Sequence, residues 1–106
     1  MKTLYLVRHA KSSWTNANMS DHARTLNDRG ERDAPEMGKR LLKRQPQPTL
    51  IISSSAVRAE TTATILAEAI DYPLSDLKID SRLYGAEAHD VIAIIQELDH
   101  AIDCAM

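Results

Sequence analysis

An arginine and a histidine stand side by side near the amino terminus, directly after a run of strand-forming apolar residues. The stretch is "LYLVRHAKSSW", residues 4 to 14, and the pair is Arg8 and His9. Ligands of parallel α/β sheets bind beyond the carboxyl ends of the strands, where this pair is expected. An imidazole can act as a nucleophile, and a guanidinium binds phosphate or carboxylate. Taken alone, the dipeptide fits a solvated loop at least as well.

A second arginine stands at the start of a predicted helix, in "SSSAVRAETTA", residues 53 to 63. Arg58 falls within about the first turn, where its charge opposes the positive end of the helix dipole by roughly 0.3–1 kcal/mol at an exposed site. An anion bound between Arg58 and the helix N-terminus would remove that conflict and use the free N–H groups. A side chain bent into solvent explains the position equally well.

The elements that must position these residues begin with a strand and a long loop. Residues 3 to 7 are short, apolar and partly β-branched, which predicts a buried strand. Residues 10 to 25 are polar and predict a loop of unusual length. The following helix starts either at a D-x-x-E capping box formed by Asp33 and Glu36, or earlier near Asn27 with a kink at Pro35.

The remainder of the chain continues the alternation. Residues 49 to 53 predict a second strand, and a helix capped by Ser54 or Ser55 runs to about Ile70. Residues 77 to 79 predict a short strand. A third amphipathic helix starts near Glu87, and its predicted apolar face includes Val91, Ile95, Leu98 and Ile102. The order β-loop-α-β-α-(β)-α indicates a single α/β domain over residues 1–106, with a parallel sheet covered by helices.

Composition narrows the classes of partner. The chain has 106 residues with a net charge of −2, so nothing draws it generally towards nucleic acid or an anionic membrane surface. Cys104 is the only cysteine, which favours a reducing compartment, and the cytoplasm is expected. The four histidines lack the spacing of metal ligands, so neither a metal nor another cofactor is expected.

Arg8, His9 and Arg58 together make the chain similar to the histidine phosphatase superfamily, which carries an Arg-His-Gly or Arg-His-Ala motif after its first strand. With "LNDRGERDAP", the likeness is to the phosphohistidine phosphatases of the SixA type, from Lys2 to about Leu98. The resemblance implies a three-layer α/β/α domain of phosphoglycerate-mutase-like type. It implies a metal-independent phosphatase in which His9 is the nucleophile and Arg8 and Arg58 bind the phosphoryl group. The substrate would be a phosphohistidine protein or a small phosphorylated molecule.

Further candidate residues follow from the same resemblance or from their closeness to His9 in the sequence. Arg24 matches a family arginine at the phosphate edge, although the usual Arg-Pro-Leu is Arg-Thr-Leu here and a surface charge is the alternative. Lys11 and Ser12 are candidates for substrate binding because they follow His9. Asp80 or Glu87 is the candidate general acid for protonating the leaving group.

The end of the chain departs from the family pattern. A second active-site histidine is expected in a Gly-His-Asn-Pro-like turn after another core strand, and "LDHAIDCAM" ends where that strand should start. His100 is interpreted as a surface histidine. The chain is therefore expected to be incomplete at its C-terminus, about two thirds of a whole domain. The alternatives to a phosphatase are a non-catalytic phosphate- or phosphoprotein-binding module and an inactive fragment.

Overall fold

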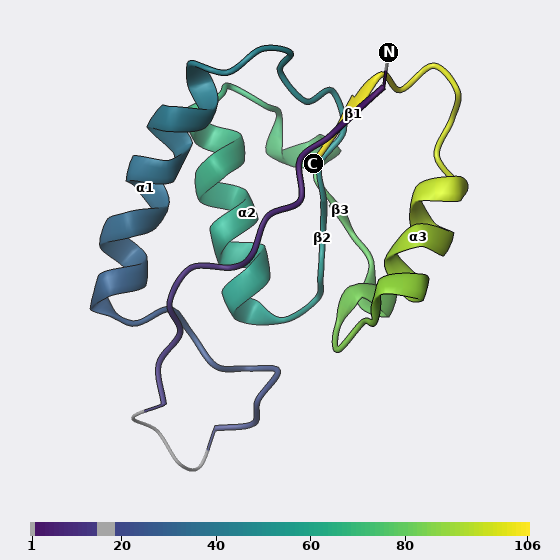
Figure 1. Cartoon of the computed structure of the whole chain (residues 1–106). Helices are drawn as coiled ribbons and strands as arrows, with labels where there is room; N and C mark the ends of the chain where they lie inside the picture. Colours follow the sequence, from purple (N-terminus) through teal and green to yellow (C-terminus); the bar gives the residue numbers. More distant parts are fainter. Residues whose placement is uncertain (1, 15–18) are drawn as a thin grey trace.

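The computed structural model describes residues 2–14 and 19–106. Strands and helices alternate along these residues (Figure 1). The helices are α1 (Asp28–Leu42), α2 (Val57–Ala69) and α3 (Ala88–Gln96), with 3-10 turns at Leu74–Asp76 and Ser81–Leu83. The strands are β1 (Thr3–Leu4), β2 (Ile52–Ser53), β3 (Lys78–Ile79) and β4 (Cys104–Ala105).

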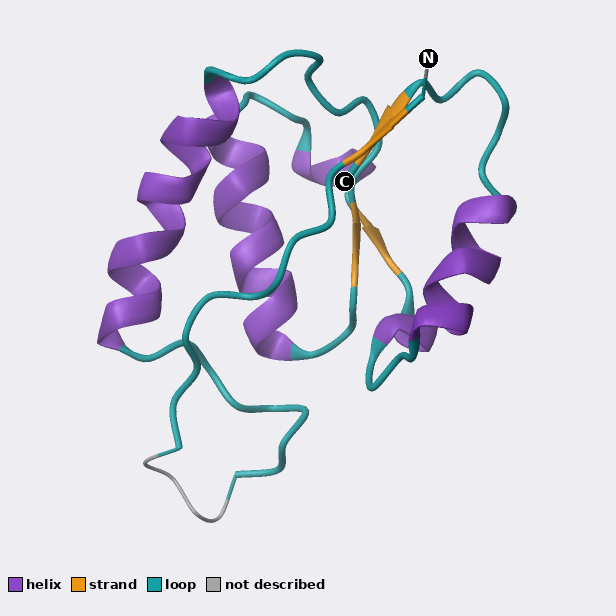
Figure 2. Ribbon diagram, in the orientation of Figure 1, coloured by secondary structure: helices purple, strands orange, loops and turns teal. Residues whose placement is uncertain are grey.

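The strand pairings among the described residues are parallel, apart from an isolated antiparallel bridge between Ser12 and Leu26. β1 pairs with β4, and β2 pairs with β3. A parallel bridge between Leu50 and Ala105 joins the two pairs, so the spatial order is β1, β4, β2, β3. Figure 2 shows α1 and α2 on one side of the strands and α3 on the other. The expected three-layer α/β/α architecture is thereby confirmed.

Helix α1 begins at the earlier of its two predicted positions. Asn27 is the N-cap, and its side-chain oxygen accepts a hydrogen bond from the Gly30 N–H at 2.9 Å. The capping box expected at Asp33 and Glu36 is wrong, because both residues lie inside the helix and Pro35 is accommodated between them. Gly30 is required there, since an added Cβ would lie 2.1 Å from the Lys11 carbonyl oxygen.

Helix α2 lacks the expected serine N-cap. Its N-cap is Ala56, which makes no side-chain capping bond, and the Val57 N–H instead donates to the His22 carbonyl at 3.0 Å. Ser54 contributes one step earlier, by accepting from the Ala56 N–H at 3.2 Å. The long loop after β1 therefore supplies part of the cap of this helix, which brings the two predicted site segments together.

The C-terminal part of the chain differs from the prediction in the length of its helix and in its last strand. The third helix ends at Gln96, so Leu98 and Ile102, taken as part of its apolar face, lie beyond it. A last core strand was expected to be missing, yet Cys104–Ala105 forms β4 and lies between β1 and the Leu50 segment. His100 is exposed, as expected.

The core lies between β2 and α2 rather than around β1. Ile51, Leu66 and Ala67 are at most 2% exposed. The expected burial of residues 3 to 7 is wrong, because Leu6 is 79% exposed and Leu4 and Val7 are nearly half exposed. In the described parts of the chain nothing packs over this side of β1. No helix in those parts is long and apolar enough to cross a bilayer.

The exposed side of β1 gives a first prediction. Leu6 lines a cavity of about 490 Å³ together with apolar residues of α3, and exposed apolar patches promote association. We expect the chain to self-associate as its concentration rises, and Leu6→Lys to shift it towards monomer in sedimentation velocity. Ile92→Lys is the control, because Ile92 is 53% exposed but does not line the cavity. Equal behaviour of the two variants would contradict the prediction.

Candidate active site

The two partners of the His9 imidazole favour one of its tautomers. Its Nδ1 lies 2.7 Å from the Ala10 carbonyl oxygen, which can only accept a hydrogen bond. Its Nε2 lies 3.3 Å from Arg58 Nε, which can only donate. Nδ1 therefore carries the proton and Nε2 presents its lone pair towards the arginine. An imidazole with an unprotonated Nε2 is the form that a nucleophile requires, and the Arg58 contact must open for that nitrogen to attack.

Arg58 extends from the first turn of α2 and is held in place at several atoms. Nη1 donates to the Asp21 carbonyl at 2.6 Å and Nη2 to the Asp21 carboxylate at 3.2 Å. The Arg58 side chain is only 12% exposed. The Asp21 carboxylate is therefore an anion beside Arg58 that the chain itself supplies, where the sequence predicted a bound anion. Together with the Nε contact to His9, these contacts use three of the five guanidinium N–H groups, and the other two can bind a ligand.

Thr62 fixes the backbone after His9 to α2. Its hydroxyl accepts from the Ala10 N–H at 3.0 Å and donates to the Arg58 carbonyl at 2.7 Å. Thr62 lies one helical turn after Arg58 and is 5% exposed. One buried hydroxyl therefore connects the segments that carry the histidine and the arginine. Thr62 is not among the residues predicted from the sequence, where its position four residues after Arg58 is its only local signal.

Thr62→Val tests this connection with a side chain of nearly the same shape. The Ala10 N–H would lose its acceptor, so we expect the free energy of unfolding to fall by about 1–3 kcal/mol. Urea denaturation followed by circular dichroism measures the change. Thr64→Val on the same helix is the control and should have the smaller effect. Equal effects would mean that the Ala10 bond contributes nothing specific.

The carboxylate of Asp21, which is not among the predicted site residues, lies at the centre of a cluster formed with Arg24, Arg58 and Tyr84. Asp21 accepts from Arg24, Arg58 and the Tyr84 hydroxyl. The Tyr84 hydrogen bond is the main cause that lowers the Asp21 pKa to about 2, and the two arginines lower it further. The same contact raises the pKa of Tyr84. A signal was available, since Asp21 and Arg24 stand three residues apart.

Two of the predicted substrate-binding residues join this cluster and a third does not. Arg24 is buried, and its Nη1 donates to Ser12 Oγ at 2.7 Å. The Arg24 guanidinium also lies 3.4 Å from the centre of the Trp14 ring, a cation–π contact. The Lys11 side chain is exposed, and its carbonyl accepts from the Asn27 N–H at 2.9 Å. Lys11 thus contributes its backbone to the start of α1.

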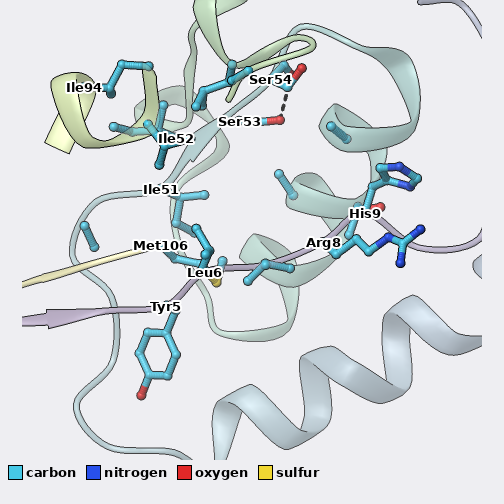
Figure 3. Close-up of a pocket in the computed structure, with 18 of the residues that line it drawn as sticks. Tyr5, Leu6, Arg8, His9, Ile51, Ile52, Ser53, Ser54, Ile94 and Met106 are labelled. Atoms are coloured by element: carbon cyan, nitrogen blue, oxygen red, sulfur yellow. Dashed lines mark hydrogen bonds between the residues drawn. The ribbon is translucent and has the colours of Figure 1, made fainter. Parts of the chain in front are cut away.

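Arg8 and His9 stand at the polar end of the cavity. Figure 3 draws both beside the cavity, which Ser53 at the end of β2 and the following Ser54 also line, together with the apolar Leu6, Ile51 and Met106. Arg8 is exposed, unlike Arg58. A guanidinium on an exposed edge and a second, anchored guanidinium beside the imidazole can approach an anion from two sides.

The two candidate acids are engaged in structural contacts. Asp80 caps the 3-10 turn after β3 and binds Arg82 at 2.7 Å, which lowers its pKa. Arg82 also binds Glu97 at 2.7 Å and so ties this turn to α3. Glu87 is the N-cap of α3, in a capping box with Asp90. An arginine-bound carboxylate with a lowered pKa is a weak proton donor near neutral pH.

The other histidines have separate environments. His22 Nε2 lies 2.9 Å from Ser55 Oγ, and its ring packs edge to face on Tyr84. His89 is exposed beside Glu87 and Asp90. Over residues 2–14 and 19–106, no three His, Cys, Asp or Glu side chains are grouped so as to hold a metal ion.

A parallel α/β domain that places a histidine and arginines beyond the carboxyl ends of its strands offers groups suited to binding an anion such as a phosphoryl group. The comparison with protein families agrees with this chemistry. The sequence model of the Histidine phosphatase superfamily (branch 1) matches residues 4–88, and the chain belongs to this family.

Individual relatives match over part of their length. The chain is 37% identical over 70 residues to an uncharacterised chloroplastic protein of Arabidopsis thaliana, which covers 66% of this chain and 32% of that protein. It is 30% identical over 89 residues to a 2,3-bisphosphoglycerate-dependent phosphoglycerate mutase of Chelativorans sp. (strain BNC1), which covers 78% of this chain and 43% of the mutase.

Among solved structures, the chain resembles one assigned as the phosphohistidine phosphatase SixA of Agrobacterium tumefaciens. The TM-score is 0.87 at 27% identity, with 97% of this chain and 65% of that chain covered. The phosphoglycerate-mutase-like fold of the SixA type is therefore shown. The chain spans less than two thirds of the length of each of these three proteins.

Proposed function

We propose that the chain acts as a phosphohistidine phosphatase that works through a phosphohistidine intermediate on His9. The observation that carries this proposal is the hydrogen bonding of the imidazole. Nδ1 donates to the Ala10 carbonyl while Nε2 accepts from Arg58, so the nucleophilic lone pair faces a bound guanidinium. Family membership and the likeness to SixA support it.

The chemistry proceeds in two displacements. In the first, Nε2 of His9 bonds to phosphorus while the bond from phosphorus to the leaving nitrogen breaks, and the leaving nitrogen takes up a proton from solvent. In the second, water attacks the phosphorus on His9, the P–Nε2 bond breaks and orthophosphate leaves. The water proton passes to solvent. Arg8 and Arg58 bind the phosphoryl oxygens throughout, because phosphoryl transfer depends mainly on positioning and charge neutralisation.

The substrate preference follows from the leaving group. A phosphohistidine P–N bond is labile and needs less help from an acid than a phosphate ester. Asp80 and Glu87 stay predictions for that acid, and the engagement of Asp80 with Arg82 favours a substrate that needs little protonation. Arg24, Ser12 and Lys11 stay predictions for substrate binding. Independence of metal and a cytoplasmic location are likewise part of the proposal.

The experiment compares phosphate release from two substrates, with and without EDTA. We expect release from a peptide that carries phosphohistidine, little from 3-phosphoglycerate, and no change on addition of EDTA. Faster release from 3-phosphoglycerate would favour a small-molecule substrate. Retention on a phosphohistidine matrix without release would favour the non-catalytic binding module. Neither retention nor release would mean that these residues have no such function by themselves.

A further inference from the structure

One carboxylate collects hydrogen-bond donors from three parts of the chain. Asp21 Oδ1 accepts from Arg24 Nε at 3.1 Å and lies 3.0 Å from Arg24 Nη2. Asp21 Oδ2 accepts from Arg58 Nη2 at 3.2 Å and from the Tyr84 hydroxyl at 2.6 Å. The carboxylate therefore joins the loop before α1, the first turn of α2 and the segment after β3.

This cluster differs from an ordinary surface ion pair. Ion pairs between exposed side chains contribute little, because both partners are solvated and free to rotate. Here the side chains of Arg24 and Arg58 are only 9% and 12% exposed, whereas that of Asp21 is 48% exposed. Arg24 is held in addition by Ser12, and Arg58 by His9. Asp21 is thus one of the contacts that hold two nearly buried guanidinium groups.

Tyr84 holds the carboxylate from the other side. Its ring packs edge to face on His22, with 4.9 Å between ring centres, and its hydroxyl donates to Asp21 Oδ2. The Tyr84 pKa is raised and that of Asp21 is lowered to about 2, mainly through this contact. Near neutral pH the carboxylate is ionised and the phenol keeps its proton. Tyr84 is therefore a permanent donor to Asp21.

We propose that Asp21 is the positioning residue of the phosphoryl site, holding Arg58 and Arg24 in one arrangement, and that Tyr84 keeps the Asp21 carboxylate in the orientation this needs. The inference rests on the proposed phosphatase function. It also accounts for the charge of the site. Arg8, Arg24 and Arg58 supply three positive charges and Asp21 supplies one negative charge. The net charge of these four side chains is therefore +2, which balances a phosphoryl dianion.

The substitution Asp21→Asn distinguishes the positioning of the two arginines by Asp21 from the effect of its negative charge on anion binding. Asparagine has one acceptor oxygen, so its NH₂ group must face the donors either of Arg24 or of Arg58 and Tyr84, and one arginine is released. The site also gains one net positive charge, which favours any bound anion. A ground-state anion should bind equally or more tightly. A transition-state analogue needs both arginines in place and should bind more weakly.

The experiment measures two dissociation constants of the full chain by calorimetry. Orthophosphate serves as the ground-state probe and orthovanadate as the transition-state probe. For Asp21→Asn we expect orthophosphate to bind unchanged or a few-fold tighter, and orthovanadate about 10- to 100-fold weaker. The two differences should be the same at pH 6 and pH 8, because Asp21 is ionised at both. Asp33→Asn, an exposed partner of Arg29 on α1, is the control.

Tyr84→Phe gives an independent check because it leaves every charge in place. It should weaken orthovanadate more than orthophosphate, in the same direction as Asp21→Asn and by less. Tyr72→Phe is its control, since it removes a hydroxyl bond to the Asp76 carbonyl at the other end of α2. A parallel loss of both ligands, or no change in either, would overturn the positioning role. Failure of the unmodified chain to bind either anion would instead overturn the proposed function, and this inference with it.

Discussion

Replacing Arg58 by alanine weakens the binding of orthovanadate by about 10- to 150-fold, which corresponds to roughly 1.5–3 kcal/mol for a hydrogen bond to a charged group. The reason lies in its geometry. Arg58 contacts His9 Nε2 directly, so its guanidinium lies beside the position that a phosphoryl group attacked by that nitrogen would take. The Arg58 side chain is only 12% exposed, so another cationic side chain could reach its position only if the surrounding structure rearranged.

Calorimetric titration of Arg58→Ala, Arg58→Lys and Arg32→Ala with orthovanadate makes the comparison. Arg58→Lys should fall between the other two, because lysine keeps the charge but not the planar fork. Arg32→Ala on the exposed face of α1 should bind as the unmodified chain does. If Arg58→Ala and Arg32→Ala bind equally, Arg58 has no part in anion binding and the site is wrongly assigned.

Replacing His9 by alanine abolishes turnover, with an expected loss of about 10³-fold or more, because the covalent route disappears with its nucleophile. Steady-state phosphate release from a phosphohistidine peptide measures the effect. The fold should be kept, since His9 is half-buried and its one backbone contact is to the adjacent Ala10.

The control for His9 is His89→Ala, which removes an exposed imidazole on α3. Its rate of phosphate release should equal that of the unmodified chain. Circular dichroism melts of both variants show whether the fold is intact. Turnover by a folded His9→Ala variant at the normal rate would exclude His9 as the nucleophile.

The sequence was sufficient for the fold class because its signals are local. Short apolar runs alternate with helical periodicity, and Asn27 and Glu87 are recognisable N-caps close to the predicted helix starts. The meeting of His9 with Arg58 could be expected because both follow strands and both belong to family motifs. Their actual contact at 3.3 Å agrees with that expectation.

The errors in the fold came from tertiary context. The run at residues 3 to 7 has the composition of a buried strand, yet Leu6 is among the most exposed apolar side chains because nothing in the described residues covers that side. The last strand was not expected, since Cys104–Ala105 is too short to show a pattern and forms by pairing with β1 more than ninety residues away. Burial and pairing of this kind depend on partners distant in sequence.

The residues missed at the site share the same cause. Asp21 meets Tyr84 across 63 residues and Arg58 across 37, and Thr62 meets Ala10 across 52. A polar residue in a long loop gives no sign of which distant donor it will meet. Only the Asp21–Arg24 pair, three residues apart, could have been noticed in the sequence.

The most direct test of the central claim is the location of the phosphoryl group on the protein. The chain is incubated with phosphoramidate, quenched in base to preserve phosphohistidine, and digested for peptide mapping by mass spectrometry. We expect a single phosphorylated site, His9, and no label in His9→Ala. Label on His22, His89 or His100, or release of phosphate with no phosphorylated histidine under any quench time, would contradict the account.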